Sequence, residues 1–291
     1  MMNALERSFE TARVRNARVV MPEISEDDRV RDAANRLAAD GLATTVQLAE
    51  PSGDLVEAVV KNRGVKPALA RRMIGKPLVR AAAMVAVGEA DVLVAGAMAP
   101  TRRVIEAASL AIGLADGIQQ PSSFFLMSFP GGREMIFADC AVAVDPDAGK
   151  LAGIARSSAT SAQALLGDAR VAFLSYATGT SGTGPSVEKV AAATEAAQAA
   201  GVTAIGPVQA DAALNPEIAE RKGSGAGDAN VLVFPSLDAG NIGYKLVQEL
   251  AGAQAIGPVL QGFRRPVCDL SRGASADDIV AATVISIALG A

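Results

Sequence analysis

The chain has 291 residues, half of them hydrophobic, and its formal net charge at pH 7 is -4. This length allows a large core divided between two domains, and a mildly acidic chain without a basic block among aromatic residues argues against nucleic-acid binding. Histidine is absent, which excludes a Ser-His-Asp triad, a histidine general base and a histidine metal site.

The two cysteines, Cys140 and Cys268, are too few for a disulfide framework or a four-thiolate zinc site. We expect both to be small buried side chains rather than nucleophiles, in a protein of the reducing cytoplasm. No apolar run has the length of a membrane span, and the N-terminal segment has no apolar core of signal-peptide length. The sequence therefore predicts a soluble cytoplasmic protein.

Strand and helix patterns alternate in the first part of the chain. Short apolar runs predict strands, and apolar residues at helical spacing predict helices. In chain order these are residues 18–21 (strand), 26–39 (helix), 45–48 (strand), 54–62 (helix), 67–90 (helix), 91–95 (strand) and 103–113 (helix). This repetition indicates a parallel sheet.

A hairpin signal interrupts the pattern in the middle of the chain. Two apolar runs, residues 122–129 and 133–144, are separated by Pro130-Gly131-Gly132, which predicts an antiparallel pair and the start of a new unit. The alternation then resumes. It comprises helices at residues 148–166, 185–200, 216–221 and 241–250, strands at 171–176, 205–209, 231–235, 255–260 and 266–270, and a final helix whose first turn carries Asp277 and Asp278.

Polar side chains gather at the strand-to-helix junction of residues 266–280. Ser271 and Arg272 follow the strand, Gly273 permits a sharp turn, and the helix start offers unpaired N–H groups that attract anions. The forked, permanently charged guanidinium suits phosphate oxygens. Because open α/β sheets bind ligands at the mouths of their strands, this junction is the predicted anion site.

The helix that follows this junction begins with a carboxylate that has two interpretations. Asp278 stands three residues after Ser275, the spacing of a capping box, in which the acid only satisfies the helix start. Taken alone, this capping role is favoured. The crowding of serine, arginine, glycine and two aspartates at one junction favours a ligand site instead.

Two further junctions have the composition of binding loops. Residues 177–184 follow a strand with the spacing G-x-x-G-x-G and could cradle an anion, although the spacing is neither a Rossmann nor a P-loop motif and a tight loop gives the same pattern. Residues 238–241 precede another helix, with Tyr244 and Lys245 in its first turns. Asn241 could be only the N-cap of that helix.

Together these segments resemble the phosphate acetyl/butyryltransferase family, and within it the phosphate acetyltransferases (phosphotransacetylases). The residues that carry the resemblance extend along essentially the whole chain: Val19-Val20-Met21-Pro22-Glu23, Phe137-Ala138-Asp139-Cys140, Ser175-Tyr176-Ala177-Thr178-Gly179-Thr180-Ser181-Gly182, Phe234-Pro235, Ala239-Gly240-Asn241-Ile242-Gly243-Tyr244-Lys245-Leu246-Val247-Gln248, Ala255-Ile256-Gly257-Pro258-Val259-Leu260-Gln261-Gly262, and Asp269-Leu270-Ser271-Arg272-Gly273 with Asp277-Asp278.

The resemblance implies a fold and a reaction. The fold is α/β, with two three-layer α/β/α domains, mostly parallel sheets and an interdomain cleft, like isocitrate and isopropylmalate dehydrogenases. Residues 1–117 and 262–291 would form the first domain, and residues 118–261 a second, dimerising domain. The reaction is the reversible transfer of an acetyl group between acetyl phosphate and coenzyme A, in acetate metabolism. A homodimer would act on these small molecules without metal or organic cofactor, and without nucleic-acid or membrane partners.

The resemblance also assigns roles to site residues. Asp278 matches the general base that deprotonates the coenzyme A thiol, and Ser271 and Arg272 match residues that bind phosphate and stabilise the transition state. The predicted substrate-binding residues are Thr178, Gly179, Thr180, Ser181, Gly182, Asn241, Tyr244, Lys245 and Gly273.

Two of the departures from the family pattern remove a positive charge. Val60 and Glu106 stand where the family places arginines associated with coenzyme A or phosphate, and Arg63, Arg102 or Arg103 could supply the charge instead. Two alternatives therefore stay open: a catalytically weak relative that binds coenzyme A, and an enzyme with a butyryl-type acyl preference. A dehydrogenase of similar fold is disfavoured, because its clustered acidic metal ligands with lysine and tyrosine cannot be assembled here.

Overall fold

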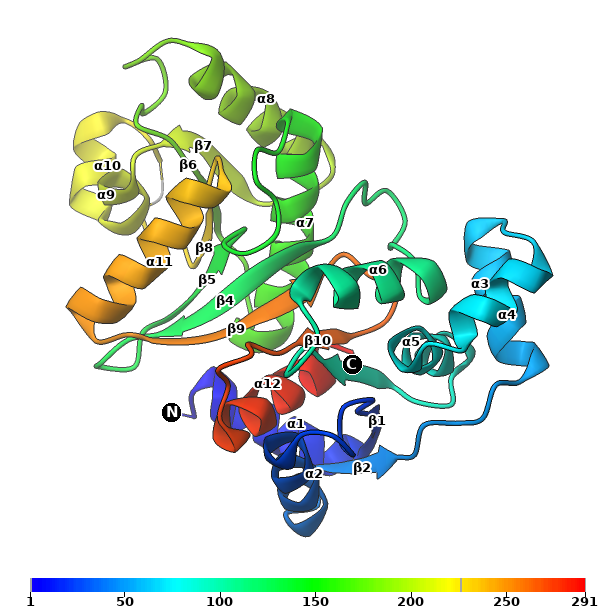
Figure 1. Cartoon of the computed structure of the whole chain (residues 1–291). Coiled ribbons are helices and arrows are strands. Elements are labelled where there is room, and N and C mark those ends of the chain that lie inside the picture. The colour runs from blue at the N-terminus through cyan, green and yellow to red at the C-terminus, as the bar shows by residue number, and fades with distance from the viewer. Residues whose placement is uncertain (1, 226, 291) are drawn as a thin grey trace. The chain divides into compact units, whose positions relative to one another are not determined.

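The computed structural model describes residues 2–225 and 227–290 (Figure 1). The chain divides into two compact units, one formed by Met1–Asp116 with Gly257–Ala291 and the other by Gly117–Ile256. Each unit is a sheet with helices packed on it, and most neighbouring strands are parallel. The α/β class that the sequence predicts is confirmed.

The sheet of the first unit brings three strand ends to one edge. Its strands, in spatial order, are β2 (Ala43–Val46), β1 (Ala17–Val20), β3 (Val92–Ala95), β10 (Val267–Asp269) and β9 (Gln254–Gln261). β1, β3 and β10 are parallel, with Val20 opposite Leu93 and Asp269 opposite Ala95, whereas β9 is antiparallel to β10. Since parallel strands end at the same edge, the segments that follow β1, β3 and β10 meet there.

Two groups of helices pack in this unit (Figure 1). α12 (Ala276–Leu289) contacts both α1 (Ala4–Arg15) and α2 (Asp28–Ala39), and α3 (Gly53–Arg63), α4 (Pro67–Ile74), α5 (Pro77–Val87) and α6 (Thr101–Ala111) form the second group. α12 buries most of its surface, and Ile279, Val284 and Ile287 are completely inaccessible to solvent. Because α12 is packed on several sides, its position is fixed, and so is the end of the loop that joins it to β10.

Two helical segments of this unit differ from the sequence prediction. α1 is not among the predicted elements, and it begins after Asn3, whose side chain forms a capping box with Glu6. The single helix predicted at residues 67–90 is instead the two helices α4 and α5. The break occurs at Pro77, which has no N–H with which to continue the preceding helix.

The second unit combines a hairpin with parallel strands. β4 (Ser122–Ser128) and β5 (Glu134–Ala138) are antiparallel, which confirms the predicted hairpin, and β8 (Val231–Val233), β6 (Val171–Leu174) and β7 (Ala204–Val208) continue the sheet in parallel with β5. The helices are α7 (Ala148–Leu166), α8 (Pro185–Ala199), α9 (Ala210–Leu214), α10 (Pro216–Lys222) and α11 (Leu237–Ala251). The segments that follow β5, β8 and β6 therefore lie at one edge.

β5 ends at Ala138 rather than at residue 144, where the sequence predicts the end of the strand. The buried carboxylate of Asp139 accepts hydrogen bonds from the Ser123 hydroxyl (2.5 Å) and from the amides of Ala141 (2.9 Å) and Ala143 (3.0 Å). These bonds fold the backbone around the carboxylate, and the backbone leaves the sheet there.

Within the described part of the chain, no helix is both long and apolar enough to cross a bilayer.

Candidate active site

The predicted anion site lies in the exposed loop between β10 and α12. The Ser271 hydroxyl accepts a hydrogen bond from the Gly273 amide (3.2 Å), so it also shapes its own turn. The Arg272 side chain is exposed, and the residues that the structure describes give it no acidic partner. Its guanidinium therefore keeps all of its donors for a ligand.

Gly273 does not have the conformational role that the sequence suggests. Its φ lies outside the left-handed region, and an added Cβ would lie 3.9 Å from the Ser271 Oγ, an ordinary contact. A side chain would fit at this position without backbone strain. The turn is formed by the serine hydroxyl rather than by glycine's freedom.

Asp278 forms the capping box of α12. Its Oδ2 accepts hydrogen bonds from the Ser275 amide (2.9 Å) and the Ser275 hydroxyl (2.7 Å), and the Ser275 Oγ accepts one from the Asp278 amide (3.2 Å). The side chain is exposed, and no described residue donates a hydrogen bond to Oδ1. The structural role of this carboxylate is thus established, and one oxygen stays open to a substrate.

Arg29, on α2, fixes the backbone of the anion loop and is absent from the sequence prediction. Its Nη1 donates to the carbonyl oxygens of Arg272 (2.8 Å) and Ala274 (2.9 Å), and its Nη2 donates to that of Ala97 (3.2 Å). An ion pair with Asp27 (2.7 Å) orients the guanidinium and lowers the pKa of that carboxyl. One side chain thus holds the loops that follow β3 and β10.

A buried glutamate organises the loop after β3. Glu23 Oε2 accepts hydrogen bonds from the amides of Gly96 and Ala97 (both 2.9 Å), and Oε1 accepts from those of Met98 (3.1 Å) and Ala99 (2.7 Å). Four backbone donors compensate the burial of one carboxylate. Glu23 belongs to the sequence motif after the first strand, but nothing in that motif reveals its partners.

Asp269, the last residue of β10, is a second buried carboxyl at this edge. It is 1% exposed, and its Oδ2 lies 2.6 Å from the Thr101 hydroxyl at the start of α6. Burial raises the pKa of Asp269 to about 7; the Thr101 hydrogen bond opposes this shift and the charge of Glu23 adds to it. Gly96 packs against the other oxygen: with φ +110°, its Cβ would lie 2.6 Å from Asp269 Oδ1.

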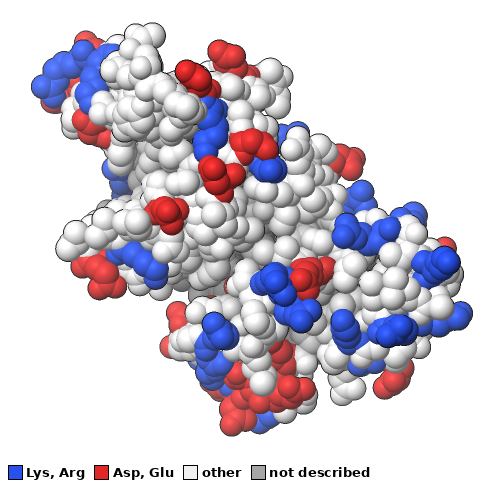
Figure 2. All heavy atoms as spheres, turned by 45° about the horizontal axis from the view of Figure 1, so that its top comes forward, with Lys and Arg blue, Asp and Glu red and all other residues white. Residues whose placement is uncertain are grey.

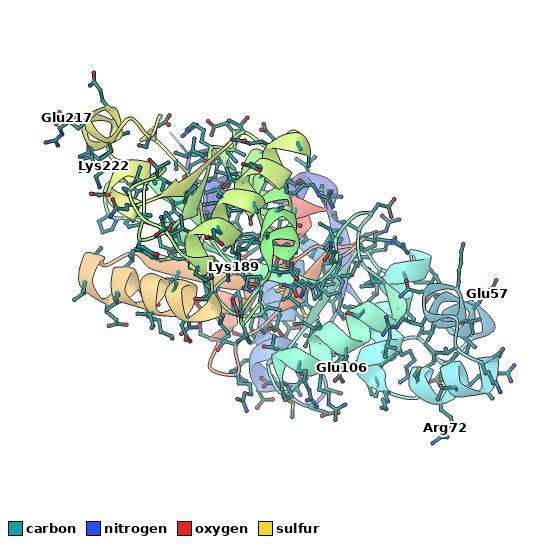
Figure 3. The ribbon with its side chains drawn as sticks, turned by 90° about the horizontal axis from the view of Figure 1, so that it is seen from above. Glu57, Arg72, Glu106, Lys189, Glu217 and Lys222 are labelled. Atoms are coloured by element: carbon teal, nitrogen blue, oxygen red, sulfur yellow. The ribbon has the colours of Figure 1, made fainter. Side chains whose placement is uncertain are left out.

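The arginines considered as replacements lie on the surface. Arg103 Nη1 pairs with Glu106 (3.2 Å), and Arg102 Nε approaches the same carboxylate (3.5 Å), so both arginines offset the charge of Glu106, which Figure 3 shows on α6. Arg63 is exposed in the last turn of α3. Arg63 belongs to a stretch of basic residues that contains no acidic residue. Basic side chains gather in Figure 2 on the side where α3 and α4 lie in Figure 1. The basic residues of this stretch are Lys61, Arg63, Lys66, Arg71, Arg72, Lys76 and Arg80.

The glycine-rich loop of the second unit uses several of its own amides. Thr178 N donates to Ser181 Oγ (2.8 Å), Gly179 N to the Pro207 carbonyl (3.0 Å) and Ser181 N to the Thr178 carbonyl (3.1 Å). The adjacent groove of about 480 Å³ is lined by Gly179, Thr180, Gly182 and Thr183 together with Glu188 and Glu195, and by no lysine or arginine. Carboxylates without cations repel an anion, so this groove does not support the predicted cradle.

The buried Thr178 side chain anchors this loop. Its Oγ1 accepts a hydrogen bond from the Gln209 amide (3.1 Å) and donates one to Gln209 Oε1 (3.3 Å). The same Oε1 accepts from Lys222 on α10 (2.9 Å), which also pairs with Asp211 (2.8 Å; Figure 3 shows Lys222). The loop is therefore tied to β7 and α10.

The three residues predicted on α11 have different environments. Asn241 is not an N-cap: α11 begins after Ser236, and the Asn241 Nδ2 donates to the Cys140 carbonyl (3.1 Å). Tyr244 is a core residue whose ring stacks on Phe125 with centroids 4.2 Å apart. Lys245 is exposed, with its Nζ 5.0 Å from the Tyr244 ring centroid. Of the three, Lys245 has the most exposed side chain, Asn241 is half-buried and Tyr244 is buried.

The cysteines are buried, as the sequence predicts. Burial raises the pKa of Cys268 to about 12 and also raises the pKa of Cys140. Neither forms a thiolate nucleophile near neutral pH. Among the described residues, no group of three or more cysteines and acids is placed to hold a metal ion.

The predicted site residues thus fall into two sets. Ser271, Arg272, Gly273 and Asp278 follow β10 in the first unit, and the remaining substrate-binding candidates follow β6 and β8 in the second. Within each unit the set lies at the carboxyl edge of the parallel strands, where this class of sheet binds ligands.

Comparison with known proteins gives matches over nearly the entire chain. The family model "Phosphate acetyl/butaryl transferase" matches residues 51–287. The phosphate acetyltransferase of Paracoccus denitrificans is 40% identical over 314 residues, covering 98% of each chain, and that of Acetivibrio thermocellus is 38% identical over 324 residues, covering 98% of this chain and 97% of the relative. The structure of EutD phosphotransacetylase from Staphylococcus aureus covers 100% of both chains with a TM-score of 0.89 and 35% identity. A phosphotransacetylase from Streptococcus pyogenes covers 99% of this chain and 98% of that one, with a TM-score of 0.92 and 35% identity.

Proposed function

The chain belongs to the phosphate acetyl/butaryl transferase family, and from that premise we propose that it is an acyltransferase that moves an acetyl group reversibly between acetyl phosphate and coenzyme A. The observation that carries the proposal is the close similarity to phosphate acetyltransferases across almost the full length of both chains. The test is thioester formation by the purified protein from acetyl phosphate and coenzyme A, with propionyl and butyryl phosphate as competitors. The proposal fails if acetyl phosphate yields no thioester; turnover of butyryl phosphate alone would support the butyryl alternative.

The reaction needs few catalytic groups. The coenzyme A sulfur attacks the acetyl carbonyl, a C–S bond forms, the C–O bond to phosphate breaks, and phosphate leaves with the bonding electrons. Most of the acceleration comes from two effects: the enzyme holds the thiol against the carbonyl carbon, and it stabilises the negative charge of the departing phosphate. Arg272, with its unpaired guanidinium, and the Ser271 hydroxyl are the groups that we assign to the phosphate.

We assign the thiol proton to Asp278. A free thiol has a pKa near 8.5 and a free aspartate one near 4, so transfer is uphill by about 4 to 5 pKa units. The carboxylate is exposed in the chain alone, and it becomes an effective base when bound coenzyme A removes its water or when Arg272 stabilises the thiolate. The capping bonds orient Oδ2 and leave Oδ1 as the proton acceptor.

We also propose that the protein acts as a homodimer through the second unit. Ile242, Leu246 and Leu250 lie four residues apart on α11 and are 57%, 53% and 83% exposed. Residues at this spacing share one helix face, and a continuous apolar stripe in water favours association with another copy. A partner helix packed on this stripe would bury all three side chains.

We propose that the enzyme uses no metal or organic cofactor and works in the cytoplasm. Acetyl phosphate already carries a good leaving group, and Arg272 supplies the positive charge that a metal would otherwise provide. The free thiols Cys140 and Cys268 suit a reducing compartment. Dialysis against a chelator should leave turnover unchanged.

A second candidate function rests on Glu106. This carboxylate occupies a position that resembles an arginine site of the family, and it neutralises Arg102 and Arg103. Reduced positive charge there favours a weak relative that binds coenzyme A without efficient turnover. Titration with coenzyme A alongside the thioester assay separates the two, because binding without turnover supports only the second.

A further inference from the structure

The Asp269 carboxyl is a titratable group that the reaction described above does not use. It stands two residues before Ser271 and is almost completely buried. Oδ2 contacts the Thr101 hydroxyl, whereas Oδ1 is buried without a hydrogen-bond partner among the described residues. A carboxylate with a bare buried oxygen is strongly destabilised relative to the neutral acid.

Two backbone amides beside Asp269 already have other partners. Gly96 packs so closely that a Cβ there would lie 2.6 Å from Oδ1 and 2.7 Å from the Leu270 nitrogen. The Gly96 amide already donates to Glu23 (2.9 Å), and the Leu270 amide already donates to the Ala95 carbonyl (2.8 Å). If Asp269 ionised, the Gly96 and Leu270 amides would have to leave their present partners to bind its free oxygen. Because Leu270 directly precedes Ser271, this change would disturb the anion loop.

Among the described residues, one negative charge acts on Asp269 and no cation forms an ion pair with it. Glu23, after β1, is the charged group that further raises the pKa of Asp269. Arg29, on α2, is paired with Asp27 and donates to backbone carbonyls. The neighbouring strand segments, residues 93–95 of β3 and 259–260 of β9, are apolar.

The helices packed against β10 have their charged groups engaged elsewhere. On α12, Asp277 pairs with Arg36 of α2, and Asp278 is held by Ser275. On α6, the charged side chains are Arg102, Arg103 and Glu106, which form a separate surface cluster. Cys268, the preceding residue, is a neutral thiol at neutral pH. Glu23 is therefore the charged side chain that bears on the state of Asp269.

We propose that Asp269 is a positioning residue that must be a neutral acid for the Ser271-Arg272 loop to bind an anion. The proposal rests on the function assigned above, in which this loop holds phosphate. The neutral acid keeps Gly96 and Leu270 on their present partners and adds no negative charge beside the ligand. The ionised form loosens that backbone and repels the ligand, so binding of the anion and retention of the proton favour each other.

The direction of the pH effect follows from the pKa of Asp269, which is about 7. Below this pH the acid is neutral and the loop binds its anion; above it the acid ionises and affinity falls. Inorganic phosphate itself titrates near neutral pH, so sulfate, whose charge is constant there, is the suitable probe. If a bound anion raises the pKa of Asp269 by one unit, sulfate binds about sevenfold more weakly at pH 8.5 than at pH 6.

The test is calorimetric titration of the full chain with sulfate between pH 6 and pH 8.5. The wild type should lose affinity through pH 7, and Asp269→Asn, which mimics the neutral acid, should bind about equally well across the range. Asp277→Asn removes an exposed carboxylate of the same helix junction and should keep the wild-type profile. A pH-independent affinity in the wild type, or an unchanged profile in Asp269→Asn, would overturn the proposal.

A second variant covers the case in which Asp269→Asn does not fold. Thr101→Val removes the hydrogen bond that lowers the pKa of Asp269, so the loss of sulfate affinity should move to higher pH, and Thr101→Ser should restore it. An unmoved profile in Thr101→Val contradicts the proposal. Sulfate binding needs no turnover. An inactive wild type would therefore refute acetyl transfer, while the pH dependence of sulfate affinity would still test the role of Asp269.

Discussion

The guanidinium of Arg29 donates a hydrogen bond of 2.8 Å to the carbonyl oxygen of Arg272, so one arginine holds the backbone of the other. Arg29→Lys keeps the charge and loses the fork that reaches three carbonyl groups. We expect the KM for acetyl phosphate to rise about tenfold or more, because the anion loop is less ordered. Steady-state kinetics of Arg29→Lys against Arg31→Lys, an exposed arginine of the same helix, measures this. Equal kinetics in the two variants would remove the positioning role.

Glu23 stabilises the loop after β3 through four backbone donors. In Glu23→Gln the charge is lost, and an amide group faces two of the N–H donors that the carboxylate accepted. We expect the free energy of unfolding to fall by about 2 to 4 kcal/mol. Urea unfolding is the measurement, with the exposed Glu26→Gln as control. A loss no larger than that of the control contradicts the assignment.

Gly96 is required by the closeness of β10 as well as by its own backbone. Gly96→Ala places a Cβ 2.6 Å from Asp269 Oδ1 at φ +110°, whereas Gly64→Ala, at φ +64°, meets no atom within 4 Å. We expect Gly64→Ala to cost about 1 kcal/mol, from backbone strain alone, and Gly96→Ala more than about 3 kcal/mol. Comparison of the two urea midpoints decides whether the packing at Gly96 is as tight as described.

The apolar stripe on α11 predicts a specific assembly mutant. Leu246→Glu places a charge in the centre of the stripe, between Ile242 and Leu250, and should convert dimers to monomers because a buried unpaired carboxylate is costly. Gln248→Glu adds the same charge away from the stripe and should leave the mass unchanged. Size-exclusion chromatography with light scattering measures the molar mass of both variants. A monomeric wild type, or a dimeric Leu246→Glu, argues against this interface.

Local signals in the sequence predict several elements accurately. The helix expected at residues 148–166 is α7, with Asp147 as its N-cap and Gly167 in the left-handed conformation at its end. The hairpin of β4 and β5 follows from Pro130-Gly131-Gly132. Such features depend on residues a few positions apart, which a sequence displays directly.

The supporting residues of the site could not be predicted, because their partners are distant in sequence. Arg29 reaches carbonyl groups 243 and 245 residues away, and the partner of Asp269, Thr101, is 168 residues away. Glu23 binds backbone amides, which are the same in every sequence. Asn241 and Tyr244 show the converse: their motif predicts substrate contacts, and the structure gives them a carbonyl and an aromatic core partner.

The role of Asp278 is tested most directly by the acetyl-transfer rate of Asp278→Asn. Asparagine keeps an oxygen that can accept from Ser275, so the helix start and the unfolding midpoint should be preserved. We expect kcat to fall by about 100-fold or more relative to the wild type and to Asp277→Asn, because the proton acceptor is gone. A rate within a few-fold of the wild type would show that this carboxylate only caps its helix and that another group accepts the thiol proton.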